Sequence, residues 1–573
     1  MKRYQEELRS IDYKAMGRHL EKLASMEKLS GSEEAEEAAA YILEELNQAG
    51  VSCHMETFAG YMSNPGASSL KLDGKIEIPS RSRAFSGDCR HGIAAELIYD
   101  TGSKDRKRAE LTSESFLNLV KGKIVVAYGD DERYALLLEK YGAAGWIQIW
   151  TSADPLIHED TISCVWGTPT VDSSLLLLEM PVIGVTLTDG NRILHWMEEQ
   201  EKAGKKALAE MSAKVDSKVT ELCMPVAEIK GDSDDFVLFS CHYDTWYGGA
   251  IDNGTANAAA IEIAKVCRRF QDKLKRSVRI IWWAGHSNGR YTGSTWYCDH
   301  HFLEMKQHCI AHINADLMGA RGGSVIGMHT AGAEGKEYLR ESAAMAAPGD
   351  QILFGEIGRG ADQSFFGLEI PYHIYSRYEV LPEEKLFRTP ATGSYQWHTA
   401  EDTVEQVDWD IYQKDAALFF LHGWRLLTEE SLPFAAEAYF TRFEEEIRSI
   451  SVNAEPDFST EEICQAVRDV RDAYFRAVEN VDQVKIRNQY IRCVCGRMNR
   501  LRLSYGSAYD HDLAITATSP FSRLKMLQGI RKEEMPAKTY LFMQTNFIRQ
   551  KNRMLDELKN LEQQLSEGQI FRG

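Results

Sequence analysis

The sequence lacks an excess of basic residues, a long apolar run and an apolar leader. It has 66 Lys and Arg against 85 Asp and Glu, for a formal net charge of -19. Nucleic-acid binding relies on clustered basic side chains, so the charge argues against a nucleic-acid partner. No stretch approaches the roughly 18 apolar residues of a membrane span, and the first residues, MKRYQEELRSIDYKAM, have no apolar core like that of a secretory signal. We therefore expect no contact with nucleic acid or membrane.

The sequence also lacks paired cysteine motifs. Its eleven cysteines are scattered, and the one close pair, Cys493 and Cys495, has no second pair at the spacing of a zinc finger. Isolated cysteines of this kind are typical of reduced thiols inside a reducing compartment. We expect a cytoplasmic protein.

The length and composition predict a globular protein of several domains. A chain of 573 residues is too long for one ordinary core, and 44% hydrophobic and 10% aromatic residues are values of a folded protein. Changes of pattern along the chain predict three parts: an α/β domain made of residues 1–64 and 217–428, an inserted β-rich domain at 65–216, and a C-terminal helical domain at 429–573.

The second half of the α/β domain carries the strongest strand patterns. Apolar runs occur at 236–240, 278–283 and 308–314, and a long helical pattern at 256–269 separates the first two. This alternation predicts an α/β fold with a mostly parallel, mixed sheet covered by helices on both faces. Near the N-terminus, Ser32 precedes an acidic, helical segment and is a plausible N-cap.

The other two parts differ in pattern. In the inserted part, strand-like runs at 122–129, 142–150 and 180–185 are short and bounded by turns. The C-terminal part has helical patterns at 461–481, 485–503 and 542–564 and no strand-like alternation. Such a helical domain could pack on its neighbour or form a homodimer.

Four residues after predicted strands or in loops have the chemistry of metal ligands. His242 follows the strand at 236–240, Asp252 lies in a glycine-rich loop, Asp316 follows the strand at 308–314, and His398 lies in Trp397-His398-Thr399-Ala400-Glu401-Asp402-Thr403. Imidazole and carboxylate groups suit zinc, and ligands of open α/β sheets gather at the carboxyl ends of strands. Asp244 and Asp402 could accept hydrogen bonds from the ligand histidines. Each residue alone also has an ordinary interpretation, such as an N-cap for Asp252.

The order of these motifs resembles that of the di-zinc aminopeptidase and glutamate carboxypeptidase family. The resemblance covers about residues 15–425 and includes Gly360-Ala361-Asp362-Gln363-Ser364-Phe365-Phe366 with Ile370-Pro371. It implies that residues 65–215 are a protease-associated domain. It also implies that His242, Asp252 and Asp316 hold one zinc ion, with Asp252 bridging to a second zinc that His398 completes.

The sequence departs from that family at one motif. Two adjacent glutamates, a general base and a zinc ligand, are expected where this chain has His286 and Ser287. A histidine can serve either as a ligand or as a base near neutral pH. We therefore place His286 among both the metal ligands and the catalytic residues, the latter with Asp244, and expect one or two zinc ions.

Two other functions stay open at this point. Loss of the glutamates could leave an inactive relative that only binds, as the transferrin receptor does in the same family. Alternatively, Gly285-His286-Ser287-Asn288-Gly289 matches the Gly-x-Ser-x-Gly motif of serine hydrolases. Asp316 or Asp362 and His398 would then complete a triad around Ser287, but His242, Asp252 and the inserted domain would have no role.

The function favoured by the sequence is zinc-dependent exopeptidase-type hydrolysis. The substrate would be a peptide or an amino-acid amide, cleaved by metal-activated water. Arg290, Tyr291 and Arg377 are candidates for binding a substrate carboxylate or carbonyl, because arginine donates from a two-pronged group. The sequence leaves open which end of the peptide is cleaved.

Overall fold

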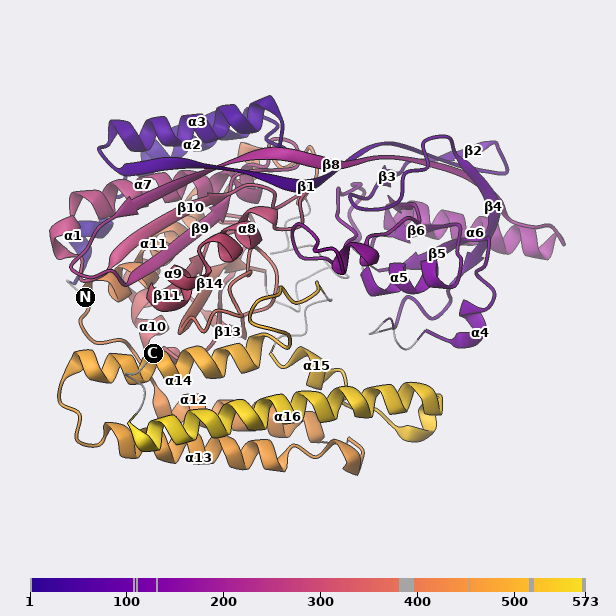
Figure 1. Cartoon of the computed structure of the whole chain (residues 1–573). Helices are drawn as coiled ribbons and strands as arrows, with labels where there is room; N and C mark the ends of the chain where they lie inside the picture. Colours follow the sequence, from indigo (N-terminus) through magenta and orange to yellow (C-terminus); the bar gives the residue numbers. More distant parts are fainter. Residues whose placement is uncertain are drawn as a thin grey trace.

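The computed structural model describes residues 3–106, 109, 112–129, 132–380, 396–452, 454–514 and 520–568. Its fourteen strands form one mixed sheet in the order β13-β12-β14-β11-β9-β10-β8-β4-β5-β6-β7-β3; in addition, β1 pairs with β8 and β2 pairs with β1. Helices flank this sheet, and a group of helices follows it at the C-terminus (Figure 1). The predicted α/β class with a mixed sheet is therefore confirmed.

Three parallel strands form the centre of the first lobe. They are β9 (Phe236–His242), β10 (Ser277–Trp283) and β11 (Cys309–Asn314), and every residue in them is buried. β9 lies between β10 and β11 and runs parallel to both. All three end at the same edge of the sheet, so residues that follow them can meet there.

The strands beyond β11 complete this side of the sheet. β14 (Tyr372–Glu379) runs parallel to β11, whereas β12 (Val325–Thr330) runs antiparallel to β14 and parallel to β13 (Ile352–Glu356). α10 (Gly335–Ala346) lies between β12 and β13 in the chain and contacts α11.

Helices cover both faces of these strands. α7 (Thr255–Arg269) contacts β9 and β10, and α11 (Trp409–Thr428) contacts β9, β11 and β14. α8 (Thr292–His300) and α9 (Phe302–His308) connect β10 to β11 across the opposite face. The chain passes from β9 to β10 in one direction and then returns past β9 to β11. Right-handed connections that run in opposite directions along a sheet lie on opposite faces. The helix predicted at 256–269 corresponds to α7.

The N-terminal helices pack on the α7 side. α1 (Gln5–Leu8) is followed by α2 (Tyr13–Ala24) and α3 (Glu33–Gln48), and both α2 and α3 contact α7. The Ser32 side chain accepts a hydrogen bond from the Ala35 N–H at 3.1 Å, which makes Ser32 the N-cap of α3 as predicted.

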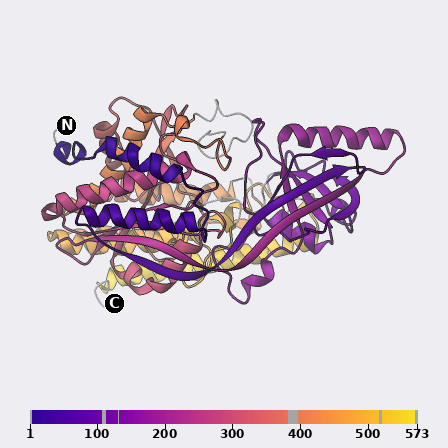
Figure 2. The same ribbon diagram turned by 90° about the horizontal axis from the view of Figure 1, so that it is seen from above.

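Two very long strands connect the first lobe to a second one. β1 (Ser52–Leu72) and β8 (Leu208–Ile229) pair antiparallel along almost their whole length and run from one lobe into the other (Figure 2). The second lobe contains four parallel strands in sequence order, β4 (Ile93–Tyr99), β5 (Ile124–Tyr128), β6 (Gly145–Ile149) and β7 (Val182–Val185).

The remaining elements of the second lobe surround these strands. They are the short strands β2 (Ile76–Ile78) and β3 (Arg81–Ser82) and the helices α4 (Glu114–Leu117), α5 (Glu132–Lys140) and α6 (Leu187–Lys202). Parallel strands that alternate with helices give this lobe its own small α/β layer and its own apolar clusters.

The C-terminal part is helical in its described residues. α12 (Ala436–Ser451), α13 (Glu461–Val478), α14 (Val484–Leu503), α15 (Ser522–Lys525) and α16 (Ala537–Glu567) lie beneath the first lobe in Figure 1. α13 and α16 contact each other along their length, and α12 and α14 contact this pair. All eleven cysteines of the chain are free thiols. Among the described residues, no helix combines the length and apolar character that crossing a bilayer requires.

Candidate metal centre

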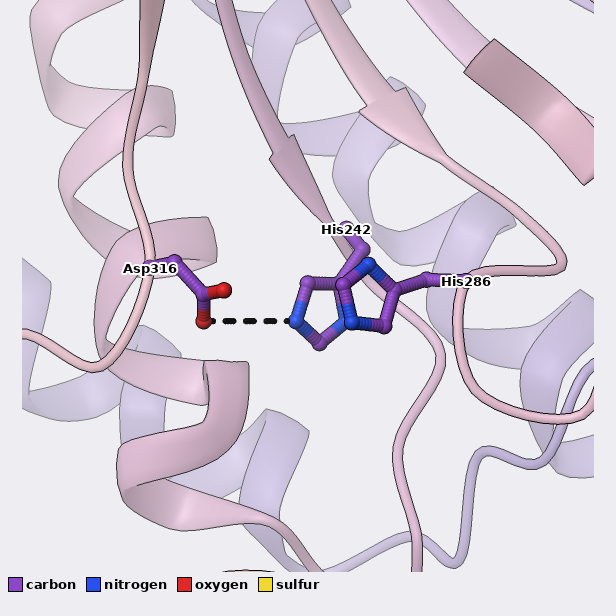
Figure 3. Close-up of side chains that lie close together, drawn as sticks. All are labelled: His242, His286 and Asp316. Carbon is purple, nitrogen blue, oxygen red and sulfur yellow. Dashed lines mark ion pairs between the residues drawn. The ribbon is translucent and has the colours of Figure 1, made fainter. Parts of the chain in front are cut away.

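Three residues at or just after the ends of neighbouring strands converge at the edge of the central sheet. His242 is the last residue of β9, His286 follows the end of β10, and Asp316 follows the end of β11. One potential ligand atom from each lies within 4.8 Å of the others. Figure 3 shows the two imidazole rings face to face and the Asp316 carboxylate directed at them. The register of three parallel strands produces this convergence.

The His286 ring is held on two sides. It stacks on His242 with 3.6 Å between ring centroids and 11° between the ring planes. Its Nδ1 atom lies 2.6 Å from Oδ2 of Asp362, while Oδ1 of Asp362 accepts a hydrogen bond from the Ser294 hydroxyl at 2.8 Å. Because Nδ1 is engaged with Asp362, Nε2 is the nitrogen of His286 left for a ligand or a proton.

Asp252 and His398 join the same centre from two loops. Asp252 lies in the turn Ala250–Gly254, and its carboxylate is 3.1 Å from His242 Nε2 through one oxygen and 3.1 Å from His398 Nε2 through the other. Asp316 Oδ1 lies 3.4 Å from the same His242 Nε2. The four residues predicted as metal ligands therefore form one connected cluster.

The donor set of this cluster fits a divalent cation such as zinc. His242 Nε2 and Asp316 Oδ1 are buried, face each other, and have no hydrogen-bond partner among the described residues. Burial would lower the pKa of His242, but the Asp252 and Asp316 carboxylates outweigh burial and raise that pKa well above its usual value. The carboxylates thus attract positive charge to this spot, where a metal ion could replace a proton.

Two further aspartates fix the backbone around the cluster. The Asp244 carboxylate accepts hydrogen bonds from the His286 and Ser287 N–H groups at 3.2 and 3.0 Å, and its backbone oxygen accepts one from His242 Nδ1 at 2.8 Å. The Asp402 carboxylate accepts hydrogen bonds from the Ile251 and Asp252 N–H groups at 2.8 and 3.0 Å. The Asp244 and Asp402 carboxylates therefore bind the backbone of the loops that carry the ligands. They do not bind the imidazole rings.

A cavity of about 620 Å³ opens beside the cluster. His286, Ser287, Asp252, Asp316 and His398 line it, and so do the three residues predicted to bind substrate, Arg290, Tyr291 and Arg377. Arg290 is paired with Glu132 of the second lobe, and Arg377 with Glu379 on β14 at 3.3 Å. Tyr291 stacks on Trp166. Both lobes thus form walls of the cavity.

The sequence analysis did not find the part of the site that comes from the second lobe. Glu159 donates its N–H to the backbone oxygen of His398, and Nδ1 of His398 donates to the backbone oxygen of Glu159, both at 2.9 Å. The His158 ring contacts the backbone oxygen of Trp397. The Glu159 contacts use backbone atoms, so no side-chain pattern in the sequence signals them.

The serine-hydrolase arrangement is not assembled among the described residues. Both ring nitrogens of His398 are engaged, Nδ1 with Glu159 and Nε2 with Asp252. The Ser287 hydroxyl forms no hydrogen bond with a histidine or carboxylate of the described residues, although its backbone N–H is bound to Asp244. This geometry favours the metal centre over a Ser287 nucleophile.

The comparison with known families supports a metallopeptidase-type hydrolase. Residues 226–421 match the model of peptidase family M28. This segment contains His242, Asp252, His286, Asp316 and His398. No curated protein matches the chain.

Solved structures of similar fold include three bacterial proteins. The aminopeptidase from Aneurinibacillus sp. strain AM-1 has a TM-score of 0.57 and 19% identity, over 74% of this chain and 96% of its own. BSAP, a zinc aminopeptidase from Bacillus subtilis, has a TM-score of 0.54 and 18% identity, over 73% and 96%. A peptidase M28 precursor from Shewanella amazonensis SB2B has a TM-score of 0.56 and 18% identity, over 73% and 93%. At these identities the likeness establishes the shared fold.

Proposed function

We propose that the protein is a zinc-dependent exopeptidase-type hydrolase that cleaves peptides or amino-acid amides. The observation that carries the proposal is the buried pair His242 Nε2 and Asp316 Oδ1, 3.4 Å apart and without hydrogen-bond partners among the described residues. Asp252 and His398 extend the pair into a set of two imidazoles and two carboxylates. Buried polar atoms without a hydrogen bond are costly, so an ion bound by both of them would explain the arrangement.

Zinc is the ion that this donor set suits best, because imidazole nitrogen and carboxylate oxygen are its usual ligands in hydrolases. One structure of similar fold is described as a zinc aminopeptidase, which supports the choice. We propose that His242, Asp252 and Asp316 hold one ion and that Asp252, His398 and His286 are available for a second. When bound, zinc would supply Lewis-acid polarisation of the carbonyl and activation of a water.

The chain's own residues would orient the substrate and move a proton. The cavity lies against the cluster, so a peptide carbonyl held there would lie beside Asp316 and His286. If His286 is not a ligand, its Nε2 can take a proton while Asp362 stabilises the charged ring from the Nδ1 side. Arg290 and Arg377 line the same cavity, where an arginine could donate to a substrate oxygen by exchanging its present partner.

The predicted division of the chain and its assembly remain part of the proposal. β1 and β8 cross the predicted boundaries at 64/65 and 216/217, so the inserted part is joined to the α/β part by continuous strands. The described residues after 428 are helical and share an apolar cluster with the first lobe, and their long helix α16 exposes Leu541, Phe542 and Ile548. We propose this group as the place for contact with a second copy.

The decisive experiment measures bound zinc by mass spectrometry, together with hydrolysis of a set of aminoacyl 4-nitroanilides and N-blocked dipeptides. Wild type, His242→Ala and His286→Ala are compared, with His195→Ala as the control, because His195 is an exposed histidine on α6. We expect His242→Ala to lose zinc and activity, and His195→Ala to keep both.

The His286→Ala variant separates the two roles of that residue. A fall from two zinc ions to one would make His286 a ligand, whereas unchanged zinc with lost turnover would make it the base. Zinc-loaded wild type that hydrolyses none of the substrates would favour a binding-only protein. Wild type without zinc, after purification and after addition of zinc, would overturn the proposal.

A further inference from the structure

We propose that Asp160 binds the positively charged amino group of the substrate and so directs the hydrolase to the amino ends of peptides. This inference rests on the proposed function and names the residue that sets its specificity. Asp160 belongs to the second lobe, between β6 and β7, and it lies outside every motif that identifies the metal cluster. Asp160 lines the cavity together with His286, Asp252 and Asp316.

The two neighbours of Asp160 tie it to the loops that carry His398 and His286. On one side, Glu159 and His398 exchange two hydrogen bonds of 2.9 Å. On the other side, the Thr161 hydroxyl donates to the backbone oxygen of Ser287 at 2.9 Å. Residues 159–161 therefore span from the loop of His398 to the loop of His286, with Asp160 in the middle. A segment tied at both ends needs little ordering when a ligand binds.

The charges around the cavity single out this carboxylate. The arginines that line the cavity are all in ion pairs, Arg290 with Glu132, Arg377 with Glu379 and Arg359 with Asp512. The lining histidines are also paired, His286 with Asp362, His329 with Glu379 and His398 with Asp252. Besides Asp160, the acidic lining residue not yet named is Asp316, which faces His242.

Asp160 forms no ion pair with any residue that the structure describes. Among the described residues, the hydrogen bond of its carboxylate comes from the Thr161 N–H to Oδ1 at 2.8 Å. Within the described lining, the charge left for a substrate is therefore negative. A substrate ammonium group complements it, whereas a substrate carboxylate would have to break an existing arginine pair.

The surroundings strengthen such an ion pair. Asp160 is half-buried, and Trp150, Trp166 and Trp397 line the same cavity. A charge pair beside aromatic walls is screened less than one in open water. Because the contact persists unchanged from the bound substrate to the transition state, its loss should raise KM and leave kcat nearly the same.

The test uses full-length, zinc-loaded protein and matched substrates. The aminoacyl 4-nitroanilide that wild type cleaves best is compared with its N-acetyl derivative, and with an N-acetyl dipeptide that has a free carboxyl end. Asp160→Asn removes the charge, Asp160→Glu restores it, and Asp172→Asn is the control, because Asp172 is an exposed aspartate of the same lobe outside the cavity. Bound zinc is measured for every variant.

We expect wild type to prefer the free amine, and Asp160→Asn to raise KM about tenfold or more, as for loss of a charged hydrogen bond. Asp160→Glu should regain part of the affinity, and zinc content should stay at the wild-type value. Equal cleavage of the acetylated substrate, cleavage of the N-acetyl dipeptide, or a fall in kcat at unchanged KM would each overturn the role of Asp160. Failure to cleave any substrate would instead contradict the proposed function itself.

Discussion

Nδ1 of His286 lies 2.6 Å from Oδ2 of Asp362, and the two residues come from loops after different strands. The Asp362 carboxylate is fully buried and is also bound to the Ser294 hydroxyl. A carboxylate behind an imidazole selects one tautomer and fixes the direction of the other nitrogen. Here that nitrogen, Nε2, is directed to the side of His242 and Asp316, where the metal is proposed to bind.

The first prediction concerns this pair. Asp362→Asn should weaken zinc binding about 10- to 100-fold, because the ring loses the partner that orients it. Asn also tolerates the left-handed backbone that Asp362 adopts, with φ of 61°. Zinc affinity is measured by competition with a chromogenic chelator, and folding by circular dichroism.

The control for this prediction is the double variant. If Asp362 acts through His286, then adding Asp362→Asn to His286→Ala should weaken zinc binding little further. Independent, additive losses would mean that Asp362 affects the metal through another route, and an unchanged zinc affinity in Asp362→Asn would contradict the orienting role.

The second prediction concerns the tie between the second lobe and His398. The His158 ring is buried, stacks on Trp150, and binds the Asp154 carboxylate at 2.9 Å and the Trp397 backbone oxygen. His158→Phe keeps the stacking but removes both hydrogen bonds of the ring, leaving Asp154 Oδ1, among the described residues, with the Leu156 N–H alone. We expect a loss of about 1–3 kcal/mol in unfolding free energy together with weaker zinc binding.

Two measurements distinguish this tie from a general loss of stability. Zinc affinity is compared in His158→Phe and in His195→Ala at a temperature where circular dichroism shows both to be fully folded. Zinc affinity equal to wild type in folded His158→Phe would mean that the second lobe does not help to position His398.

Local patterns predicted much of the first lobe. Apolar runs gave the three central strands to within two residues, because strands buried on both faces are continuously apolar. The same strands made the meeting of His242, Asp316 and His286 foreseeable, since parallel strands end at one edge. The predicted strand at 142–150 is shorter in the structure, Gly145–Ile149, because Gly142 and Ala143 belong to the preceding turn.

Contacts between distant segments could not be foreseen in the same way. The pairing of Glu159 with His398 uses backbone atoms, which every residue has, so no side-chain pattern signals it. The bond of His286 to Asp362 depends on how the loop at 360–364 folds back onto the sheet. The long strands β1 and β8 were missed as single elements because neither has a continuous apolar pattern: the middle of β8, residues 217–219, is exposed, and the middle of β1 includes Gly60, Ser63 and Asn64.

The third prediction is a pH dependence of stability that comes from Asp415. This residue of α11 is buried and accepts hydrogen bonds from the Gly319 and Tyr378 N–H groups, both at 2.8 Å. Burial raises the pKa of Asp415 to about 7. The folded state therefore holds a proton that the unfolded chain releases near pH 4, and the contribution of Asp415 to stability is lost as the pH rises from about 4 through 7.

Asp415→Asn cannot titrate and should remove this slope. Relative to wild type, the variant should gain up to about 1.4 kcal/mol in unfolding free energy per pH unit between pH 5 and 7. Urea unfolding at several pH values measures it, with Asp410→Asn, an exposed site on the same helix, as the control. A constant difference between Asp415→Asn and wild type over this range would contradict the raised pKa.

The last prediction concerns the loop that carries Asp252. Asp402 holds this loop through the Ile251 and Asp252 N–H groups, while Nζ of the buried Lys28 donates to the Gly248 backbone oxygen at 2.8 Å from the other side. Asp402→Ala leaves two buried N–H groups unpaired, which should cost about 2–4 kcal/mol of unfolding free energy.

The same change should weaken zinc binding more than it changes the fold, because Asp252 is the residue that contacts both His242 and His398. Glu401→Ala is the matched control, since Glu401 is the exposed neighbour in the same loop. Chelator competition and urea unfolding are measured on both variants. Asp402→Ala could instead lose stability but bind zinc as tightly as Glu401→Ala. In that case the position of Asp252 would not depend on the hydrogen bonds to Asp402, and these bonds would contribute to stability alone.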